Sequence, residues 1–277
     1  MKKLVLILAA IAIVPSFISC GQKETSIKVM SYNIRYGTAP DGDNAWDIRK
    51  VATPAMLADQ APAAFGVQEA LDFQIAYILE NCPQYKCVGV GREDGVEKGE
   101  HMSIFYDTNK IELLDWGTYW LSETPDVPSK GWDAQCYRTA TWTKMKLKGT
   151  KKEFFYVNTH LDHVGKEARK NGLALIVNNI AAMNPKGLPM ILTGDMNMKP
   201  DNENFTELYK VMKSARTEAI DSDDTPSATG FKAPSSIIDY VFYSGFEKCT
   251  DFKVVNKSYE NIPFISDHYT VIATLVF

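Results

Sequence analysis

The segment Leu188-Pro189-Met190-Ile191-Leu192-Thr193-Gly194-Asp195-Met196-Asn197 joins a short apolar run to a polar turn. An apolar run bounded by turn residues predicts a buried strand, here over 188–192. Asp195 and Asn197 then fall at the carboxyl end of that strand, the edge of an open α/β sheet where ligands bind. Their oxygens suit a hard cation and can orient water. The alternative is an Asx-turn, in which both side chains cap their own backbone.

The N-terminus has the pattern of an export signal. Lys2 and Lys3 precede an apolar run over 4–14, which is too short to span a bilayer as a helix. Ile18-Ser19-Cys20 resembles a bacterial lipobox, whose cysteine is lipidated; plain secretion is the alternative. We therefore expect a signal peptide over 1–19, a tether over 20–26 and one domain over 27–277. The expected location is the outer membrane or cell surface as a lipoprotein, or else the periplasm or the medium.

The charge of the chain restricts its partners. The net charge is −4, and removal of residues 1–19 leaves 28 basic and 34 acidic residues, a net charge of −6. A mildly acidic protein is a poor candidate for gripping duplex nucleic acid with a basic face. A metal enzyme stays open, because a divalent ion supplies positive charge. No repeat or linker indicates a second domain, and we expect a monomer whose membrane contact is limited to a lipid on Cys20.

Strand-like and helix-like segments alternate along the mature chain, which predicts an α/β domain of layers with two sheets. Four cysteines follow Cys20 without zinc-like spacing, and their pairing is left open. The expected helices cover 47–59, 72–80, 166–183 and 204–213. The expected strands cover 27–32, 63–67, 85–91, 101–106, 118–121, 137–147, 154–159, 188–192, 237–242, 252–255 and 269–277.

Polar residues recur at the ends of these strands. Asp239 is unusual because it lies inside Ile237-Ile238-Asp239-Tyr240-Val241-Phe242, where a buried carboxylate needs a partner. His268 is the candidate partner. Each residue has an ordinary structural explanation, such as a core histidine bonded to backbone for His160. One shared site explains all of them together: Asn33, Glu69, His160, Asp195, Asn197, Asp239, Asp267 and His268.

Six short motifs carry a family resemblance. They are Ser-Tyr-Asn at 31–33, Gln-Glu at 68–69, Asn-Thr-His-Leu at 158–161, Gly-Asp-Met-Asn at 194–197, Ile-Asp-Tyr at 238–240 and Ser-Asp-His at 266–268. Their order resembles that of the endonuclease/exonuclease/phosphatase superfamily, which has the DNase I-like fold. The resemblance covers residues 27–277. It implies a four-layer α/β/β/α sandwich of two packed mixed β-sheets flanked by helices, with the site at one end.

The resemblance also implies roles. Glu69 would be the main ligand of Mg²⁺, or of Mn²⁺ as the second option, with Asn33 and Asp267 beside it. Asp195 and Asn197 would position the attacking water and the phosphate. His268, oriented by Asp239, would face the phosphate.

Further residues follow from the DNase I branch of that superfamily. His160 would pair with Glu100, and Arg138 would contact phosphate, although a surface salt bridge explains an arginine there equally well. Asn158 belongs to the Asn-Thr-His-Leu motif and is expected to bind substrate. The branch has a tyrosine two residues before the glutamate, and Lys98 stands at that position here.

These parts predict hydrolysis of a phosphate ester by in-line attack of water, with Asp195 or His160 taking its proton. A nuclease is the first expectation, and a phosphatase or a phospholipase C-type enzyme acting on inositol phosphate or sphingomyelin is the alternative. A surface lipoprotein that binds without catalysis is the second alternative. Trp120 lies near the end of the expected strand over 118–121, and Trp132 lies on the loop that follows. Both could stack on a base or sugar; the alternative is that they are core or rim residues.

Overall fold

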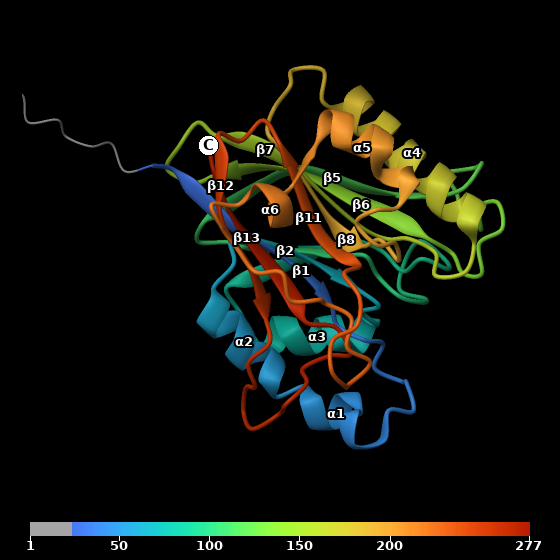
Figure 1. Ribbon diagram of the computed structural model, residues 1–277, viewed down its shortest axis with the longest axis vertical. Coiled ribbons are helices and arrows are strands. Elements are labelled where there is room, and N and C mark those ends of the chain that lie inside the picture. The colour runs from blue at the N-terminus through green and yellow to red at the C-terminus, as the bar shows by residue number, and fades with distance from the viewer. Residues whose placement is uncertain (1–23) are drawn as a thin grey trace, which may run out of the picture.

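Two mixed β-sheets pack face to face in the computed structural model, which describes residues 24–277 (Figure 1). The expected signal peptide and the expected lipidation site, Cys20, precede these residues and lie outside the described part. Within 24–277, none of the helices has the length and apolar character needed to cross a membrane. The four cysteines of this part are free thiols: Cys82, Cys87, Cys136 and Cys249.

The first sheet has seven strands in the order β10-β12-β13-β1-β2-β4-β3. They are β1 Ser26–Asn33, β2 Ala64–Gln68, β3 Tyr85–Val88, β4 Ile104–Asp107, β10 Asp221–Ser222, β12 Lys248–Val255 and β13 Thr270–Val276. The second has six strands in the order β5-β6-β7-β8-β11-β9. They are β5 Ile111–Trp120, β6 Thr139–Leu147, β7 Glu153–His160, β8 Met190–Asp195, β9 Lys213–Ser214 and β11 Asp239–Ser244.

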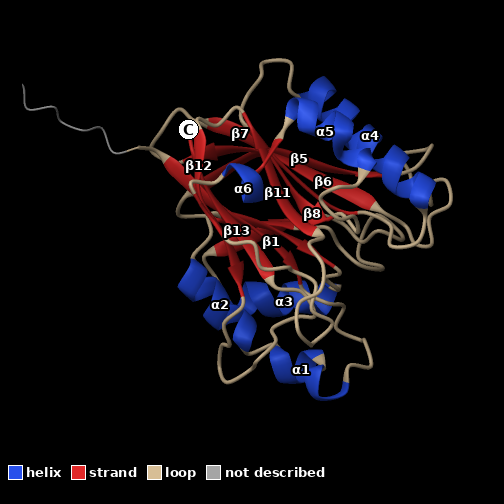
Figure 2. Ribbon diagram, viewed as in Figure 1, coloured by secondary structure: helices blue, strands red, loops and turns tan. Residues whose placement is uncertain are grey.

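Helices cover the outer faces of both sheets, which confirms the expected four-layer sandwich (Figure 2). The helices are α1 Trp46–Arg49, α2 Ala52–Gln60, α3 Asp72–Asn81, α4 Lys166–Met183, α5 Thr206–Val211 and α6 Ala215–Glu218, with 3₁₀ turns at Gly42–Asn44 and Glu203–Phe205. One apolar core lies between α2, α3 and the first sheet, and another between α4, α5 and the second sheet. A third core joins the two sheets.

The single helix expected over 47–59 is wrong, because the chain forms α1 and α2 there. Pro54 explains the break: proline has no backbone N–H, and its ring clashes with the carbonyl four residues earlier, that of Lys50. The remaining helix predictions agree with the structure to within a few residues. Strands β9 and β10 and helix α6 are too short for a periodic pattern to predict.

Polar groups tie the two sheets together beneath one end of the sandwich. The Tyr156 hydroxyl on β7 donates to the carbonyl of Met30 on β1 (2.8 Å) and accepts from the backbone N–H of Gly66 on β2 (2.9 Å). Asn158 donates to the carbonyl of Val67 at 2.7 Å. A Cβ at Gly66 would lie 2.2 Å from Asn158 Oδ1, so only glycine allows this close approach. These contacts fix the relative position of the two sheets where the functional side chains emerge.

Candidate active site

The strand register brings the predicted site residues together. β7 and β8 run parallel, and His160 is paired with Asp195 at their carboxyl ends. β11 is antiparallel to β8, so its first residue, Asp239, is also paired with Asp195. In the other sheet Asn33 ends β1, and Glu69 directly follows β2, which runs parallel to β1. The polar strand ends therefore meet at one end of the sandwich.

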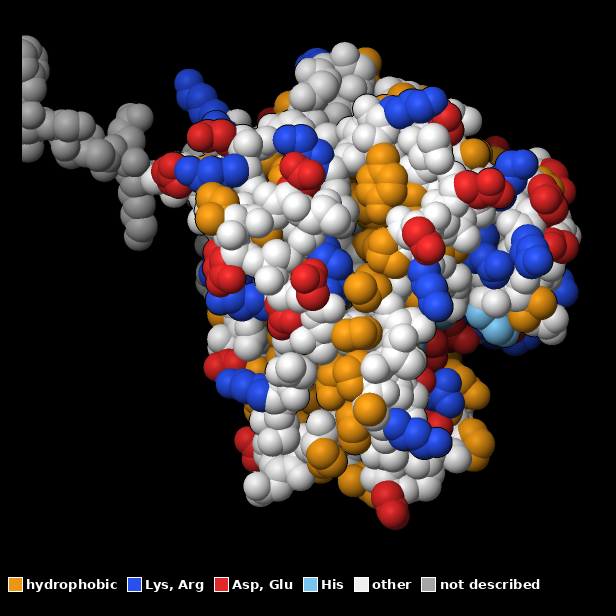
Figure 3. Space-filling view, viewed as in Figure 1, with side chains coloured by type: hydrophobic (Ala, Val, Ile, Leu, Met, Phe, Trp, Pro, Cys, Tyr) orange, Lys and Arg blue, Asp and Glu red, His pale blue; other side chains and the backbone are white. Residues whose placement is uncertain are grey.

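A cleft of about 450 Å³ lies at this end. Figure 3 shows histidine and acidic side chains gathered in a recess at the right of the molecule. The cleft is lined by Arg35, Tyr36, Glu69, Arg92, Glu100, Cys136, Arg138, His160, His163, Asp195, Asn197, Asp267 and His268. Eight of these are predicted site residues: Glu69, Glu100, Arg138, His160, Asp195, Asn197, Asp267 and His268.

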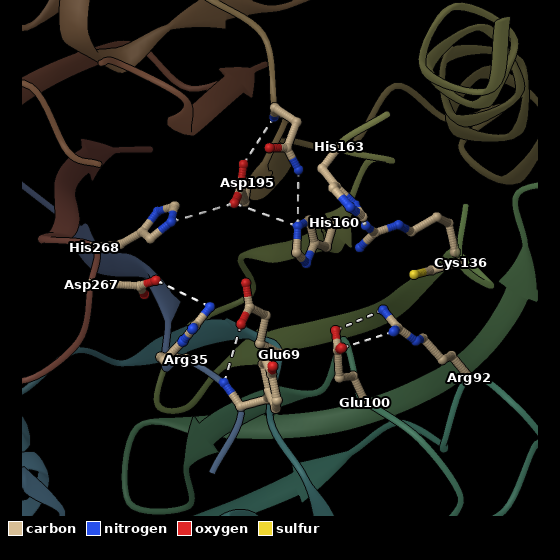
Figure 4. A pocket seen from close by; sticks show the side chains of 13 residues that line it. Arg35, Glu69, Arg92, Glu100, Cys136, His160, His163, Asp195, Asp267 and His268 are labelled. Carbon is tan, nitrogen blue, oxygen red and sulfur yellow. Dashed lines mark hydrogen bonds and ion pairs between the residues drawn. The ribbon is translucent and has the colours of Figure 1, made fainter. Parts of the chain in front are cut away.

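One side of the cleft, which we call the acidic wall, consists of Arg35, Glu69, Asp195, Asp267 and His268, with Asp239 behind His268 (Figure 4). The other side, the paired wall, consists of Arg92, Glu100, Arg138 and His163, with Asp162 behind Arg138. His160 lies between the two walls, and Asn197 contacts its ring.

Asn33 connects the two central carboxylates of the acidic wall. Its Nδ2 donates to Glu69 Oε1 (3.0 Å) and to Asp195 Oδ2 (3.1 Å). Its Oδ1 accepts from the backbone N–H of Arg35 (3.0 Å), which fixes the orientation of the amide. The expected metal ligand Asn33 therefore uses its oxygen on the backbone and presents N–H groups to the carboxylates. In this structure it positions Glu69 and Asp195.

Three residues of the cleft have a left-handed backbone, which is costly for residues other than glycine. The φ angles are 58° at Arg35, 62° at Glu69 and 49° at Asn197. At Glu69 this conformation allows Oε2 to accept from the backbone N–H of Tyr36 at 3.1 Å while Oε1 accepts from Asn33. The backbone is thus bent where the side chains must converge.

His268 is held by Asp239, as its sequence context predicts. His268 Nδ1 lies 2.8 Å from Asp239 Oδ2, and Nε2 lies 3.9 Å from Asp195 Oδ2. Burial lowers the pKa of His268, but the charge and hydrogen bond of Asp239 outweigh that effect, together with the charge of Asp195. The pKa of His268 therefore lies well above its usual value, and the ring is cationic at neutral pH.

His160 is in the opposite protonation state. Burial, followed by the charges of Arg138 and Arg92, lowers its pKa well below the usual value, so the ring is neutral. Asn197 Nδ2 donates to the carbonyl of Leu161 (2.9 Å) and faces His160 Nε2 at 3.0 Å, which makes Nε2 an acceptor. The ring proton of His160 is then on Nδ1, which is buried and has no hydrogen-bond partner among residues 24–277.

The expected pairing of His160 with Glu100 is wrong in this structure. Both oxygens of Glu100 accept from Arg92, at 2.7 and 2.8 Å, in a bidentate ion pair. A planar guanidinium offers two parallel N–H groups and competes well against a single imidazole N–H for a carboxylate. Arg138, the other predicted residue of this wall, pairs with buried Asp162 (3.2 Å) and donates to His163 Nδ1 (3.0 Å).

Three residues expected to bind substrate lie outside the cleft lining. Asn158 is fully buried between the sheets and bonds to Gln68 and Val67. Trp120 is buried and donates its indole N–H to the carbonyl of Arg92 (2.7 Å). Trp132 is half-buried in the loop before β6. The two tryptophans therefore do not form the stacking platform expected from the sequence.

Five cleft residues had no predicted role: Arg35, Tyr36, Arg92, Cys136 and His163. Arg35 and Tyr36 directly follow Asn33, and His163 follows the Asn-Thr-His-Leu motif, so closeness to a motif was the available signal. Arg92 and Cys136 lie in loops, where no periodic pattern indicates which side chains point inward.

The acidic wall fits a divalent cation. Burial, reinforced by Asp239, raises the pKa of Asp195, and burial likewise raises the pKa of Asp267. Oxygens of Glu69 and Asp195 and a nitrogen of His160 lie within 4.8 Å of one another. Four carboxylates here face two cations, Arg35 and His268, which leaves negative charge for a metal ion to balance. Carboxylate oxygens are ligands of hard cations such as Mg²⁺.

The chain belongs to the Endonuclease/Exonuclease/phosphatase family, whose model matches residues 30–268. It is a hydrolase of phosphoester bonds. A solved protein of this family from Bacteroides thetaiotaomicron is 34% identical, with 92% of this chain and 99% of that chain covered and a TM-score of 0.86. A mannosyl-6-phosphatase from the same organism is 33% identical, with 91% and 100% covered and a TM-score of 0.87. A Bacteroides vulgatus protein is 34% identical, with 91% and 99% covered and a TM-score of 0.85.

Proposed function

We propose that this protein is a metal-dependent phosphomonoesterase that removes the phosphate group from a phosphorylated sugar. The main support is its likeness to the mannosyl-6-phosphatase of Bacteroides thetaiotaomicron, which extends over 91% of this chain and all of that one. At 33% identity the two proteins share a fold and a family.

The shape of the cleft also favours a small substrate over the nuclease that the sequence placed first. A volume of about 450 Å³ is typical of sites that enclose a small organic ligand. Trp120 and Trp132, the candidates for stacking on bases, do not line it. On the face shown in Figure 3, basic side chains are interspersed with acidic ones and form no continuous track for a nucleic-acid backbone.

The proposed metal is Mg²⁺, with Mn²⁺ as the second option. Glu69 and Asp195 would hold it, because their oxygens face the same part of the acidic wall, and Asp267 lies on the same side of the cleft. When bound, such an ion offsets the negative charge of the phosphate group and of its transition state.

The residues of the chain would divide the remaining work. Cationic His268 would donate Nε2–H to a phosphoryl oxygen, with Asp239 holding the ring through Nδ1. Asp195 would accept the proton of the attacking water, because the competing base His160 already accepts from Asn197 at Nε2. Asn33 and the backbone N–H of Asn197 would keep the Asp195 carboxylate in place, at 3.1 and 2.9 Å.

The proposal is tested by comparing hydrolysis of mannose 6-phosphate with that of bis-p-nitrophenyl phosphate and single-stranded DNA. We expect the monoester to be hydrolysed with a kcat/KM at least about tenfold above the diesters, in the range of ordinary enzymes. Chelation should abolish turnover, and added Mg²⁺ should restore it. Preferred cleavage of DNA would instead support the nuclease.

Glu69→Ala provides a separate test of the metal assignment. We expect this variant to weaken Mg²⁺ binding about 10–100-fold, as measured by titration calorimetry, because a carboxylate that faces the site is lost. The matched control is Glu93→Gln, which alters an exposed carboxylate paired with Lys98. Unchanged Mg²⁺ affinity in Glu69→Ala would contradict the assignment.

Export and lipidation of Cys20 remain part of the proposal, as does a monomeric state. A Cys20→Ser variant should move from the membrane fraction to the soluble fraction if the lipobox is used. Membrane association that persists in this variant would contradict the lipid anchor.

A further inference from the structure

The paired wall contributes nothing to the chemistry proposed above, yet it forms a full side of the cleft. Its charges are balanced: Arg92 is paired with Glu100, and Arg138 with Asp162. Figure 4 places Arg92 and Glu100 across the cleft from Asp267 and His268, the side at which phosphate would bind. A wall for a second phosphate would offer uncompensated cations. This wall instead matches an uncharged, polar part of the substrate.

The pair of Arg92 and Glu100 has unused hydrogen-bonding capacity. Two parallel bonds of 2.7 and 2.8 Å use one N–H of each terminal nitrogen and one lone pair of each oxygen. The second N–H of each nitrogen and further lone pairs of each oxygen are left for other partners. Donors and acceptors fixed side by side in one plane complement neighbouring hydroxyl groups, each of which both donates and accepts.

The guanidinium groups of this wall are largely buried. The side chains of Arg92 and Arg138 are 10% and 4% exposed. Among residues 24–277, Arg92 Nε and Arg138 Nη1 are enclosed by protein and have no hydrogen-bond partner. The part of this wall that a ligand can reach includes the Arg92–Glu100 pair, which lines the cleft with side chains that are 10% and 16% exposed.

The pair is held rigidly relative to the acidic wall. The backbone N–H of Arg92 donates to the carbonyl of Glu100 (3.1 Å), and the indole of Trp120 donates to the carbonyl of Arg92 (2.7 Å). His101, which follows Glu100, donates its backbone N–H to the carbonyl of Ala70 (2.7 Å), and Ala70 directly follows Glu69. The distance between the two walls is therefore set by backbone contacts, as a site that measures the length of a substrate requires.

We propose that Arg92 and Glu100 form the subsite that binds the hydroxyl groups of a hexose while its 6-phosphate lies at the acidic wall. The inference rests on the proposed function and adds to it the residues that select the sugar. Glu100 then determines which sugar is accepted as the leaving group. This role differs from the pairing with His160 that the sequence predicted.

The experiment compares two phosphomonoesters, mannose 6-phosphate and p-nitrophenyl phosphate, whose leaving groups differ in hydroxyl content. In Glu100→Gln, we expect the ratio of kcat/KM for the sugar to that for the nitrophenyl ester to fall about tenfold or more, mainly through a raised KM for the sugar. Arg92→Lys, which keeps the charge and loses the bidentate geometry, should lower the same ratio. The matched control Glu93→Gln, in the same loop, should leave the ratio unchanged.

A binding measurement supplies a readout that does not depend on turnover. Saturation-transfer NMR with free mannose and metal-free protein should show contact in the wild type and lose it in Glu100→Gln. Equal loss of kcat/KM on both esters would overturn the inference and assign Glu100 to the catalytic step. Absence of mannose contact in the wild type would overturn it as well. Failure to hydrolyse either ester in the wild type, by contrast, would refute the proposed function itself.

Discussion

The two walls of the cleft use the same residue types in opposite electrostatic states. In the paired wall each guanidinium has its own carboxylate, Arg92 with Glu100 and Arg138 with Asp162. In the acidic wall four carboxylates face the cations of Arg35 and His268, and burial raises the pKa of Asp195 and Asp267. The difference separates two tasks, because a balanced wall can support folding and recognition while an unbalanced wall attracts a cation.

This comparison predicts that substitutions in the acidic wall cost turnover, whereas substitutions in the paired wall cost stability or selectivity for the sugar. The largest expected effect is that of His268→Ala. Loss of the cationic donor that we propose faces the phosphate should lower kcat by about 10²–10³-fold, as for other donors to a developing negative charge. The variant also leaves the buried carboxylate of Asp239 without its partner and should lower the melting temperature, so kcat is measured well below the melting temperature of the variant. Near-native turnover in this variant would contradict the assignment of catalysis to the acidic wall.

In the paired wall we expect Asp162→Asn to lower the free energy of unfolding by about 3 kcal/mol, because it leaves the Arg138 guanidinium buried without its counter-charge. The same carboxylate accepts the backbone N–H groups of Val164 and Gly165 before α4. Urea denaturation measures the change. The control Asp126→Asn alters an exposed carboxylate and should stay within about 0.5 kcal/mol. A stability loss no greater than that of the control would show that the ion pair of Arg138 and Asp162 does not stabilise the fold.

A smaller effect, on pH dependence, is expected for Asp239→Asn. The protonated form of His268 is present below its pKa in the folded protein, which lies well above the usual value of about 6.5, and is lost as pH rises through it. Removing the Asp239 charge lowers that pKa, so the alkaline limb of kcat/KM should move down by about one pH unit or more. In the wild type, the stabilisation from this pair is fully present below pH of about 6.5 and is lost as pH rises through the raised value. An unmoved alkaline limb would assign it to another group.

The smallest expected effect is that of Asp267→Asn on the metal-free protein. A carboxylate whose pKa is raised on folding destabilises the folded state once pH exceeds its unfolded value of about 3.9. Removing it should therefore raise the unfolding free energy at pH 8 by about 1 kcal/mol or less, with no gain at acidic pH. Calorimetry in the presence of a chelator at both pH values checks this sign. A stability loss at pH 8 would indicate that the ion pair with Arg35, at 3.4 Å, outweighs the repulsion.

The sequence predicted the acidic wall better than the paired wall, for a physical reason. Residues at the carboxyl ends of neighbouring parallel strands meet automatically, so the motifs at 158–161 and 194–197 were enough to bring His160 next to Asp195. The pairing of Arg92 with Glu100 depends on how a loop of nine residues closes, which local patterns do not determine.

Asn158 shows a second limit of such reasoning. It lies two residues before His160 on β7 and therefore faces the same side of the sheet. Asn158 lies two residues further from the end of the strand, where the opposing sheet covers its side chain. The backbone of Gly66 in that sheet lies directly against its amide. A strand pattern predicts which face of the sheet a side chain occupies. Which residues of that face are buried and which reach the cleft depends on how the two sheets pack.

The left-handed backbone at Arg35, Glu69 and Asn197 has a consequence for laboratory evolution. Each such conformation costs a non-glycine residue about 1–3 kcal/mol, and all three side chains border the cleft. A selection for heat resistance would favour glycine at these positions, since glycine relaxes the backbone at little cost. Such a selection would therefore enrich heat-resistant proteins that have lost side chains of the cleft. Screens on this scaffold should measure turnover together with thermal tolerance.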